Sequence, residues 1–187
     1  AEAGWEDSNA DGILDREIDG KRVDFKFTII TNNGNDRRRT GCLIFQEGCR
    51  RAGVEVDVET QEWANLLDNT KLHNFDAYIG GWIASPNESD PKQIWHTESF
   101  NGGSNYVGFG DENSDALIEA LRTELDQEKR NQLWKDLQTA IRKDMPYIFL
   151  LSQKERISIH KKFDHAYATG IRPGYWKSGF KPSESAL

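Results

Sequence analysis

The sequence predicts an α/β fold in which an open, mostly parallel β-sheet is flanked by helices. Two segments have the character of strands: residues 23–31 alternate and then become continuously apolar, and residues 54–60 alternate strictly between apolar and polar side chains. Between them, residues 37–52 place apolar side chains at helical spacing. Strand, helix and strand in this order form a βαβ unit, whose strands run parallel with a right-handed crossover.

The neighbouring elements extend the same pattern. Residues 32–36 are rich in Asn, Asp and Gly and predict a turn, and Gly53 ends the first helix. A second helix is expected over residues 62–72, and it leads into a short strand at residues 75–79 that is rich in aromatic and branched side chains. The first half of the chain is therefore expected to run β-α-β-α-β.

The second half is predicted to contain a pair of helices followed by a strand. One helix is expected to begin at a cap formed by Asn113 or Ser114, and another at a cap formed by Asp126, because each precedes apolar residues at helical spacing. Pro146 ends this helical pair. The apolar run 147–151 that follows predicts a buried strand.

The composition limits the kind of protein. The chain has 187 residues, and a domain of this length buries roughly 70% of its unfolded surface, so neither a metal ion nor a disulfide is required for folding. With a net charge of −7, nucleic acid is not an expected partner, because phosphate binding requires a basic surface. The basic run Arg37–Arg39 is interpreted as the solvated end of a helix. No apolar run approaches the ~20 residues that span a bilayer.

The two cysteines, Cys42 and Cys49, are seven residues apart within the first predicted helix. At the helical rise their Cα atoms lie roughly 10 Å apart, beyond the ~7 Å limit for a disulfide. We therefore expect free thiols on the buried side of this helix.

The first segment resembles part of an EF-hand calcium loop, with a glycine at position 6 to supply the sharp turn. Position 12, where the pattern requires a bidentate Glu, is Ile18, so a calcium site here is incomplete. The alternative is a polar turn in which Asp and Asn side chains bond to their own backbone. The candidate calcium ligands are the side chains of Asp7, Asn9, Asp11 and Asp15 and the carbonyl oxygen of Ile13.

The strand at 75–79 ends in Gly80, Gly81 and Trp82, followed by a polar loop. Glycines allow another molecule or segment to approach the backbone closely, and ligands of open α/β sheets lie beyond the carboxyl ends of the strands. This stretch is therefore a candidate ligand contact. The alternative is that Trp82 belongs to the core and the glycines serve only the turn.

No motif for covalent or cofactor chemistry is recognisable. The four histidines show no metal-ligand spacing, and neither a Gly-x-Ser-x-Gly elbow nor a Gly-x-Gly-x-x-Gly fingerprint follows a strand. The sequence therefore predicts a protein that is not an enzyme and has no cofactor other than the calcium considered above. Two alternatives remain: a hydrolase-type domain that uses cleft carboxylates, and a structural or interaction module.

A family resemblance covers nearly the whole chain. The residues that carry it are Glu2-Ala3-Gly4-Trp5, the Asp-x-Asn-x-Asp-Gly loop, Thr31-Asn32, Arg51-Ala52-Gly53-Val54-Glu55-Val56, Glu62-Trp63, Phe75-Asp76-Ala77-Tyr78, Gly81-Trp82, Asp90-Pro91, Ser104-Asn105-Tyr106, Asp115-Ala116-Leu117-Ile118 and Met145-Pro146-Tyr147-Ile148. In this order they resemble the C-terminal lobe of the extracytoplasmic peptide-binding proteins of ABC importers. Members of this cluster bind dipeptides, oligopeptides, nickel or some oligosaccharides. The resemblance implies a periplasmic-binding-protein-like lobe that captures a ligand, most simply a peptide.

The resemblance also implies site residues. The strand that ends in Gly-Trp feeds a cleft-lining loop in the family, so Gly81, Trp82, Ile83, Ala84 and Ser85 correspond to ligand-facing positions. Peptide-binding members often carry an Asp three residues after the Trp, where it pairs with the α-ammonium group of the peptide. Here that position is Ser85, which cannot neutralise a charge. In the same loop, Glu88 or Asp90 could take over this role.

The implied architecture is larger than this chain. Residues 1–187 correspond to a single C-terminal lobe of a two-lobed, three-domain protein, with residues 155–187 returning toward the missing N-terminal lobe. The opening Ala1–Trp5 resembles the end of a helix, so we expect an excised fragment. The implied partners are a peptide or other small ligand, the missing lobe, and an ABC permease. The expected location is periplasmic or extracytoplasmic, either free or anchored to the membrane through the missing N-terminus.

Overall fold

The computed structural model describes residues 3–83, 90–152, 156–170 and 174–183. The chain forms two compact units, each built from two segments. The first unit consists of Ala1–Trp82 and Glu98–Gly108, and the second of Ile83–Thr97 and Phe109–Leu187.

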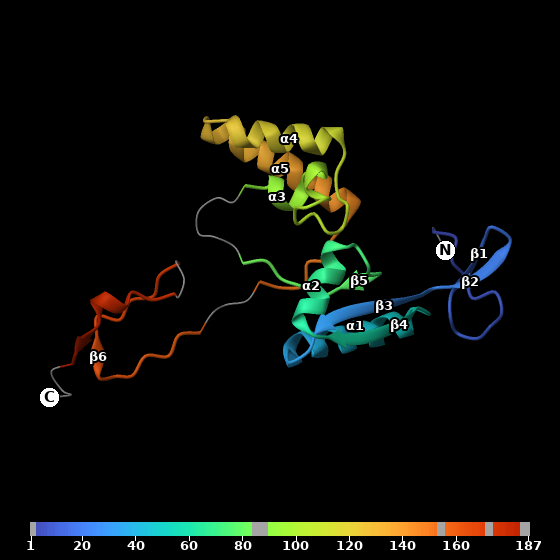
Figure 1. Cartoon of the computed structure of the whole chain (residues 1–187), viewed down its shortest axis with the longest axis horizontal. Helices are drawn as coiled ribbons and strands as arrows, with labels where there is room; N and C mark the ends of the chain where they lie inside the picture. The colour runs from blue at the N-terminus through green and yellow to red at the C-terminus, as the bar shows by residue number, and fades with distance from the viewer. Residues whose placement is uncertain (1–2, 84–89, 153–155, 171–173, 184–187) are drawn as a thin grey trace. The chain divides into compact units, whose positions relative to one another are not determined.

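The first unit contains a three-stranded parallel sheet in the order β4-β3-β5 (Figure 1). The central strand β3 pairs along its whole length with β4, while β5 pairs only with Ile29 and Ile30. The elements follow one another as β3 (Lys26–Asn32), α1 (Asp36–Arg51), β4 (Glu55–Gln61), α2 (Trp63–Lys71) and β5 (Ala77–Tyr78). The predicted α/β class with its βαβ unit is thus confirmed.

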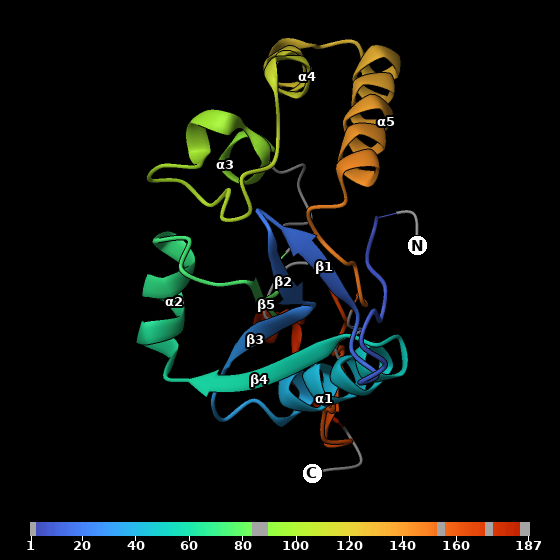
Figure 2. The same ribbon diagram turned by 90° about the vertical axis from the view of Figure 1, so that its right-hand side faces the viewer.

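Both faces of this sheet are covered. Ile29 packs in one buried cluster with Cys42 of α1 and Val56 of β4, and Figure 2 shows α1 running alongside β4. Because successive strand residues point to opposite faces, the buried Ile30 lies on the other side, and α2 contacts β3 with Leu66 as a buried residue. Two covered faces explain the continuously apolar end of β3. The two cysteines are free, as predicted.

A β-hairpin precedes the sheet and was not predicted. It consists of β1 (Asp15–Ile18) and β2 (Lys21–Asp24), which pair antiparallel. The turn residues Asp19 and Gly20 both have positive φ, 52° and 74°, as a two-residue hairpin turn of type I′ requires. The predicted strand 23–31 is therefore two strands.

The second unit is built around a helix pair. Its elements are α3 (Lys92–Trp95), α4 (Glu112–Thr123) and α5 (Gln127–Asp144), and η1 (Thr97–Ser99) joins it to the first unit. The core side chains include Phe109, Ile118, Leu121, Leu137 and Ile141. The predicted cap of α4 was wrong: Asp111 is the N-cap residue, and Ser114 completes a capping box with it. The predicted cap of α5, Asp126, is confirmed.

The strand predicted at residues 147–151 was wrong. These residues form neither helix nor strand, and Ile148, Phe149, Leu150 and Leu151 are between 59% and 71% exposed. The run has the composition of a strand, but none of the described strands pairs with it. The chain ends instead with β6 (Phe163–Asp164), η2 (Lys177–Gly179) and β7 (Lys181–Pro182), where β6 and β7 pair antiparallel.

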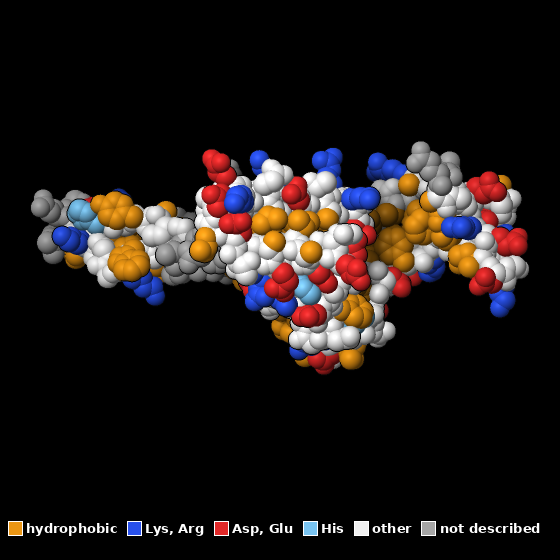
Figure 3. Space-filling model, turned by 90° about the horizontal axis from the view of Figure 1, so that it is seen from above, with side chains coloured by type: hydrophobic (Ala, Val, Ile, Leu, Met, Phe, Trp, Pro, Cys, Tyr) orange, Lys and Arg blue, Asp and Glu red, His pale blue; other side chains and the backbone are white. Residues whose placement is uncertain are grey.

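Charged side chains of both signs lie on the surface (Figure 3). On the face shown in Figure 3, acidic and basic side chains are interspersed. Among the described helices, none combines the length and the apolar character needed to cross a bilayer.

Candidate functional site

The chain leaves the sheet at the carboxyl end of β5 through Gly80, Gly81 and Trp82. The backbone N–H of Ile79 donates to the carbonyl oxygen of Ile30 (3.1 Å), which ties the chain to β3 just before the turn. A Cβ atom at Gly80 would lie 2.7 Å from Cε2 of Tyr78, so only glycine lets the Tyr78 ring rest against this backbone. The glycines therefore fix where Trp82 leaves the sheet.

Trp82 is 48% exposed, and the rest of its surface contacts protein, including another aromatic ring. It stacks on Tyr106 with ring centroids 6.2 Å apart and an interplanar angle of 14°. Tyr106 meets Tyr78 edge to face at 6.4 Å, and Tyr78 meets Phe75 in the same way at 5.0 Å. Trp82 is thus the open end of a row of four aromatic rings, with part of its surface free to cover an apolar or planar ligand group.

Arg38 brings a positive charge to this turn. A Cβ atom at Gly81 would lie 3.7 Å from Nη2 of Arg38, and Nη1 of the same guanidinium donates to Oδ1 of Asn32 (2.8 Å). The Asn35 side chain caps α1 by accepting from the Arg38 backbone N–H (3.1 Å). The interpretation of this basic run as a solvated helix end was therefore wrong for Arg38, which is partly buried beside the turn. A guanidinium in this position can pair with a carboxylate.

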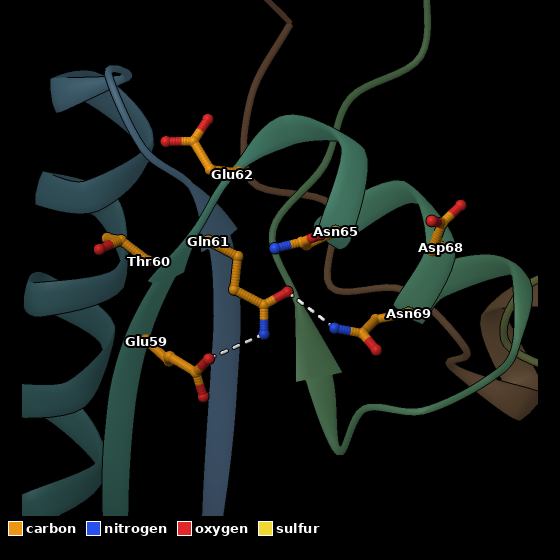
Figure 4. Close-up of a pocket in the computed structure, with 7 residues that line it drawn as sticks. All are labelled: Glu59, Thr60, Gln61, Glu62, Asn65, Asp68 and Asn69. Carbon is orange, nitrogen blue, oxygen red and sulfur yellow. Dashed lines mark hydrogen bonds between the residues drawn. The ribbon is translucent and has the colours of Figure 1, made fainter.

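A separate groove of about 410 Å³ lies between the end of β4 and α2 (Figure 4). Its side chains bond to one another: Gln61 Nε2 donates to Glu59 (2.8 Å), and Asn69 Nδ2 donates to Gln61 (2.9 Å). The lining contains three carboxylates and no cation. The lining residues are Glu59, Thr60, Gln61, Glu62, Asn65, Asp68 and Asn69. None of them belongs to the Gly80–Trp82 turn.

Comparison with known proteins decides the family. The model of the family described as "Bacterial extracellular solute-binding proteins, family 5 Middle" matches residues 1–104, more than half of the chain. The chain belongs to this family. The resemblance noted in the sequence is thereby confirmed.

Individual relatives agree. The chain is 36% identical over 154 residues to the oligopeptide-binding protein AppA of Bacillus subtilis, an alignment that covers 80% of this chain and 27% of AppA. It is 29% identical over 172 residues to a probable ABC transporter-binding protein of Deinococcus radiodurans, covering 82% and 28%. The solved structure of Bacillus subtilis AppA in complex with a nonapeptide superimposes with a TM-score of 0.71 at 34% identity, covering 78% of this chain and 28% of AppA. The chain thus spans little more than a quarter of the length of these relatives.

Only some of the other ligand positions suggested by the family lie within the described residues. Ala84, Ser85 and Glu88 lie outside the described residues. Ile83 is 69% exposed and is the first residue of the second unit. The carboxylate of Asp90 accepts from Nε of Arg122 (3.0 Å) and is therefore already paired with a cation.

The acidic loop near the N-terminus has the geometry of a polar turn. Asp7 accepts from the backbone N–H groups of Asp11 (3.1 Å) and Gly12 (3.0 Å), and Asp11 accepts from the N–H of Ile13 (2.9 Å). The Ile13 bond lowers the pKa of the Asp11 carboxyl. Asp15 is buried and accepts from the backbone and hydroxyl of Ser8 (3.0 and 2.7 Å). Within the described residues no three His, Cys, Asp or Glu side chains converge as a metal site. Calcium binding by Asp7, Asn9, Asp11, Ile13 and Asp15 stays a prediction.

Sequence reasoning missed Arg38 and Tyr106 as members of the site. Tyr106 follows β5 by a long connection, and its position against Trp82 arises from folding rather than from spacing. His96 is buried, with Nδ1 3.4 Å from Asp115 and Nε2 3.5 Å from Glu119.

Proposed function

We propose that this chain is the part of an ABC-importer solute-binding protein that contacts the ligand, and that the ligand is a peptide. The observation that carries the proposal is the half-exposed Trp82, backed by Tyr106 and placed beside the Arg38 guanidinium, in a chain of this family. The relative AppA is described with a nonapeptide bound.

Capture involves no bond making or breaking. The Trp82 ring offers an apolar surface to a peptide side chain, and Arg38 offers a partner for a carboxylate of the peptide. Since the family's usual Asp is Ser85 here, the α-ammonium group would be held by neutral acceptors or by a carboxylate elsewhere.

A second wall is required. A bound ligand has about 70–90% of its surface buried, which one wall cannot provide, and this chain spans 27% of AppA. The rest of the protein would supply the opposite wall, and closure of the two lobes about a hinge would enclose the peptide. The closed form would then be presented to an ABC permease outside the cytoplasm.

The test uses the intact protein that contains this chain. Native mass spectrometry after purification from its own cells should show co-purifying peptide masses, and calorimetry should show binding of a nonapeptide with free termini. Arg38→Gln should weaken binding of this nonapeptide more than Arg39→Gln, a matched change on the exposed side of the same helix turn. Absence of any peptide mass, together with no heat from the nonapeptide, would refute a peptide ligand.

A further inference from the structure

His73 has a backbone conformation that favours glycine. It follows α2 and its C-cap residue Leu72, and its φ is +56°. The N–H of His73 donates to the carbonyl oxygen of Thr70 (3.3 Å), and the N–H of Asn74 donates to that of Asn69 (2.8 Å). These two bonds form a Schellman motif, whose left-handed position is usually glycine because a Cβ atom is strained there. A histidine at this position calls for a compensating contact of its side chain.

The imidazole ring supplies such contacts. Nδ1 lies 3.0 Å from the carbonyl oxygen of Tyr106, and Nε2 lies 3.1 Å from that of Phe100. The ring also stacks on the Phe100 ring, with centroids 3.8 Å apart and an angle of 12°. Carbonyl oxygens only accept hydrogen bonds, so the neutral ring can bond one of them and the protonated ring can bond both.

The contacted loop is itself compact. Asn105 is fully buried, and its backbone N–H donates to the carbonyl oxygen of Ser99 (3.2 Å). A Cβ atom at Gly108 would lie 3.3 Å from the Phe100 ring, so that ring is held between His73 and the Gly108 backbone. A tie at Phe100 and Tyr106 therefore locates the whole loop relative to α2.

We propose that His73 is a positioning residue for the ligand-contacting ring. It holds the backbone of Tyr106 in place, and the Tyr106 ring holds Trp82 by stacking. The inference rests on the proposed function insofar as Trp82 contacts the ligand, whereas the tie between His73 and Tyr106 stands on geometry alone.

The variant His73→Gly separates this role from a purely structural one. Glycine fits the left-handed position without strain, so the end of α2 is preserved while both carbonyl contacts and the ring stack are lost. If His73 served only as a helix cap, the glycine variant would be at least as stable as the wild type and would leave Tyr106 and Trp82 in place. If His73 positions Tyr106, the loop loosens although the protein stays folded.

The experiment compares two readouts in the intact protein. The first is the NMR signal of the Trp82 indole N–H, assigned by Trp82→Phe, which senses ring stacking. In His73→Gly this signal should move toward its position in Tyr106→Ala, at an unchanged melting temperature. The second is the affinity for a nonapeptide with free termini, which should fall about fivefold, the size expected for losing one or two hydrogen bonds.

The matched control is His165→Gly. His165 also has positive φ, +57°, but its ring contacts Tyr167 and belongs to the second unit. This control should leave the Trp82 signal unchanged. An unmoved Trp82 signal in His73→Gly would overturn the proposal. If the wild type neither binds the nonapeptide nor carries a co-purifying peptide, the proposed function fails, and the indole signal still decides the role of His73.

Discussion

Replacing Trp82 by Ala in the intact protein tests the site and gives a magnitude that can be worked from the structure. A buried Trp covers roughly 150–250 Å², and with 48% of this side chain exposed, about 100 Å² is covered by protein. At ~25 cal/mol per Å² this corresponds to ~2.5 kcal/mol, which a compact unfolded chain reduces by roughly 10–40%. We expect the free energy of unfolding to fall by about 2 kcal/mol, against about 3–5 kcal/mol for a fully buried Trp.

The effect on binding comes from the other half of the ring. If a ligand covers the exposed part, again about 100 Å², removal of the ring weakens affinity by ~2.5 kcal/mol, or about seventyfold. Chemical denaturation measures the first quantity, and calorimetry with a nonapeptide measures the second. Trp176→Ala is the control, because Trp176 is 61% exposed and lies outside the site. A loss of stability above about 4 kcal/mol with unchanged affinity would place Trp82 in the core and refute the reasoning.

Three further outcomes are expected. Calcium should bind to the N-terminal acidic loop no more tightly than about millimolar, because the loop lacks its last carboxylate. Asp11→Asn should abolish any heat of calcium binding that calorimetry detects. If the wild type shows no heat of calcium binding, only the polar turn remains. Burial raises the pKa of the Cys42 thiol, so alkylation should be slow at pH 8 until denaturant is added, and fast labelling of the folded protein would contradict the buried position. Hydrogen bonds from Arg50 and Arg51 lower the pKa of Glu47 to about 2. Since the folded pKa lies below the ordinary value of 4.5, this stabilisation is present above pH 4.5 and is lost as the pH falls toward 2; an NMR titration that gives an ordinary pKa would refute the ion pairs.

The sheet could be predicted because periodicity reports directly which faces are covered. Ile29 and Ile30 are adjacent and both buried because helices lie on both sides of β3. The hairpin carried a readable signal as well, the Asp19-Gly20 pair, but the alternation of β2 merges with that of β3 and hides the break. The strand at residues 147–151 was predicted wrongly for a different reason. Apolar composition indicates a tendency to be buried, but it does not reveal whether a partner strand is present.

Part of the candidate site could be predicted from the sequence, and part of it could not. The Gly80–Trp82 turn is visible in the sequence, since glycines at the end of a strand mark a bend or a close approach to the backbone. Arg38 and Tyr106 join it only through folding, and nothing in their local sequence distinguishes them. The position of His73 was equally hidden, because its contact with Tyr106 spans 33 residues and its positive φ is a property of the folded helix end.

The exposed run Ile148–Leu151 has a consequence for how this chain behaves in solution. Four consecutive large apolar residues that are exposed and belong to no helix or strand form the kind of segment through which identical molecules associate edge to edge. Proline and charged residues beside such a segment oppose that self-association, and here Pro146 lies on its N-terminal side. Expressed by itself at high concentration, the chain should therefore form oligomers or aggregate through this segment, and a lysine at Phe149 should keep it dispersed.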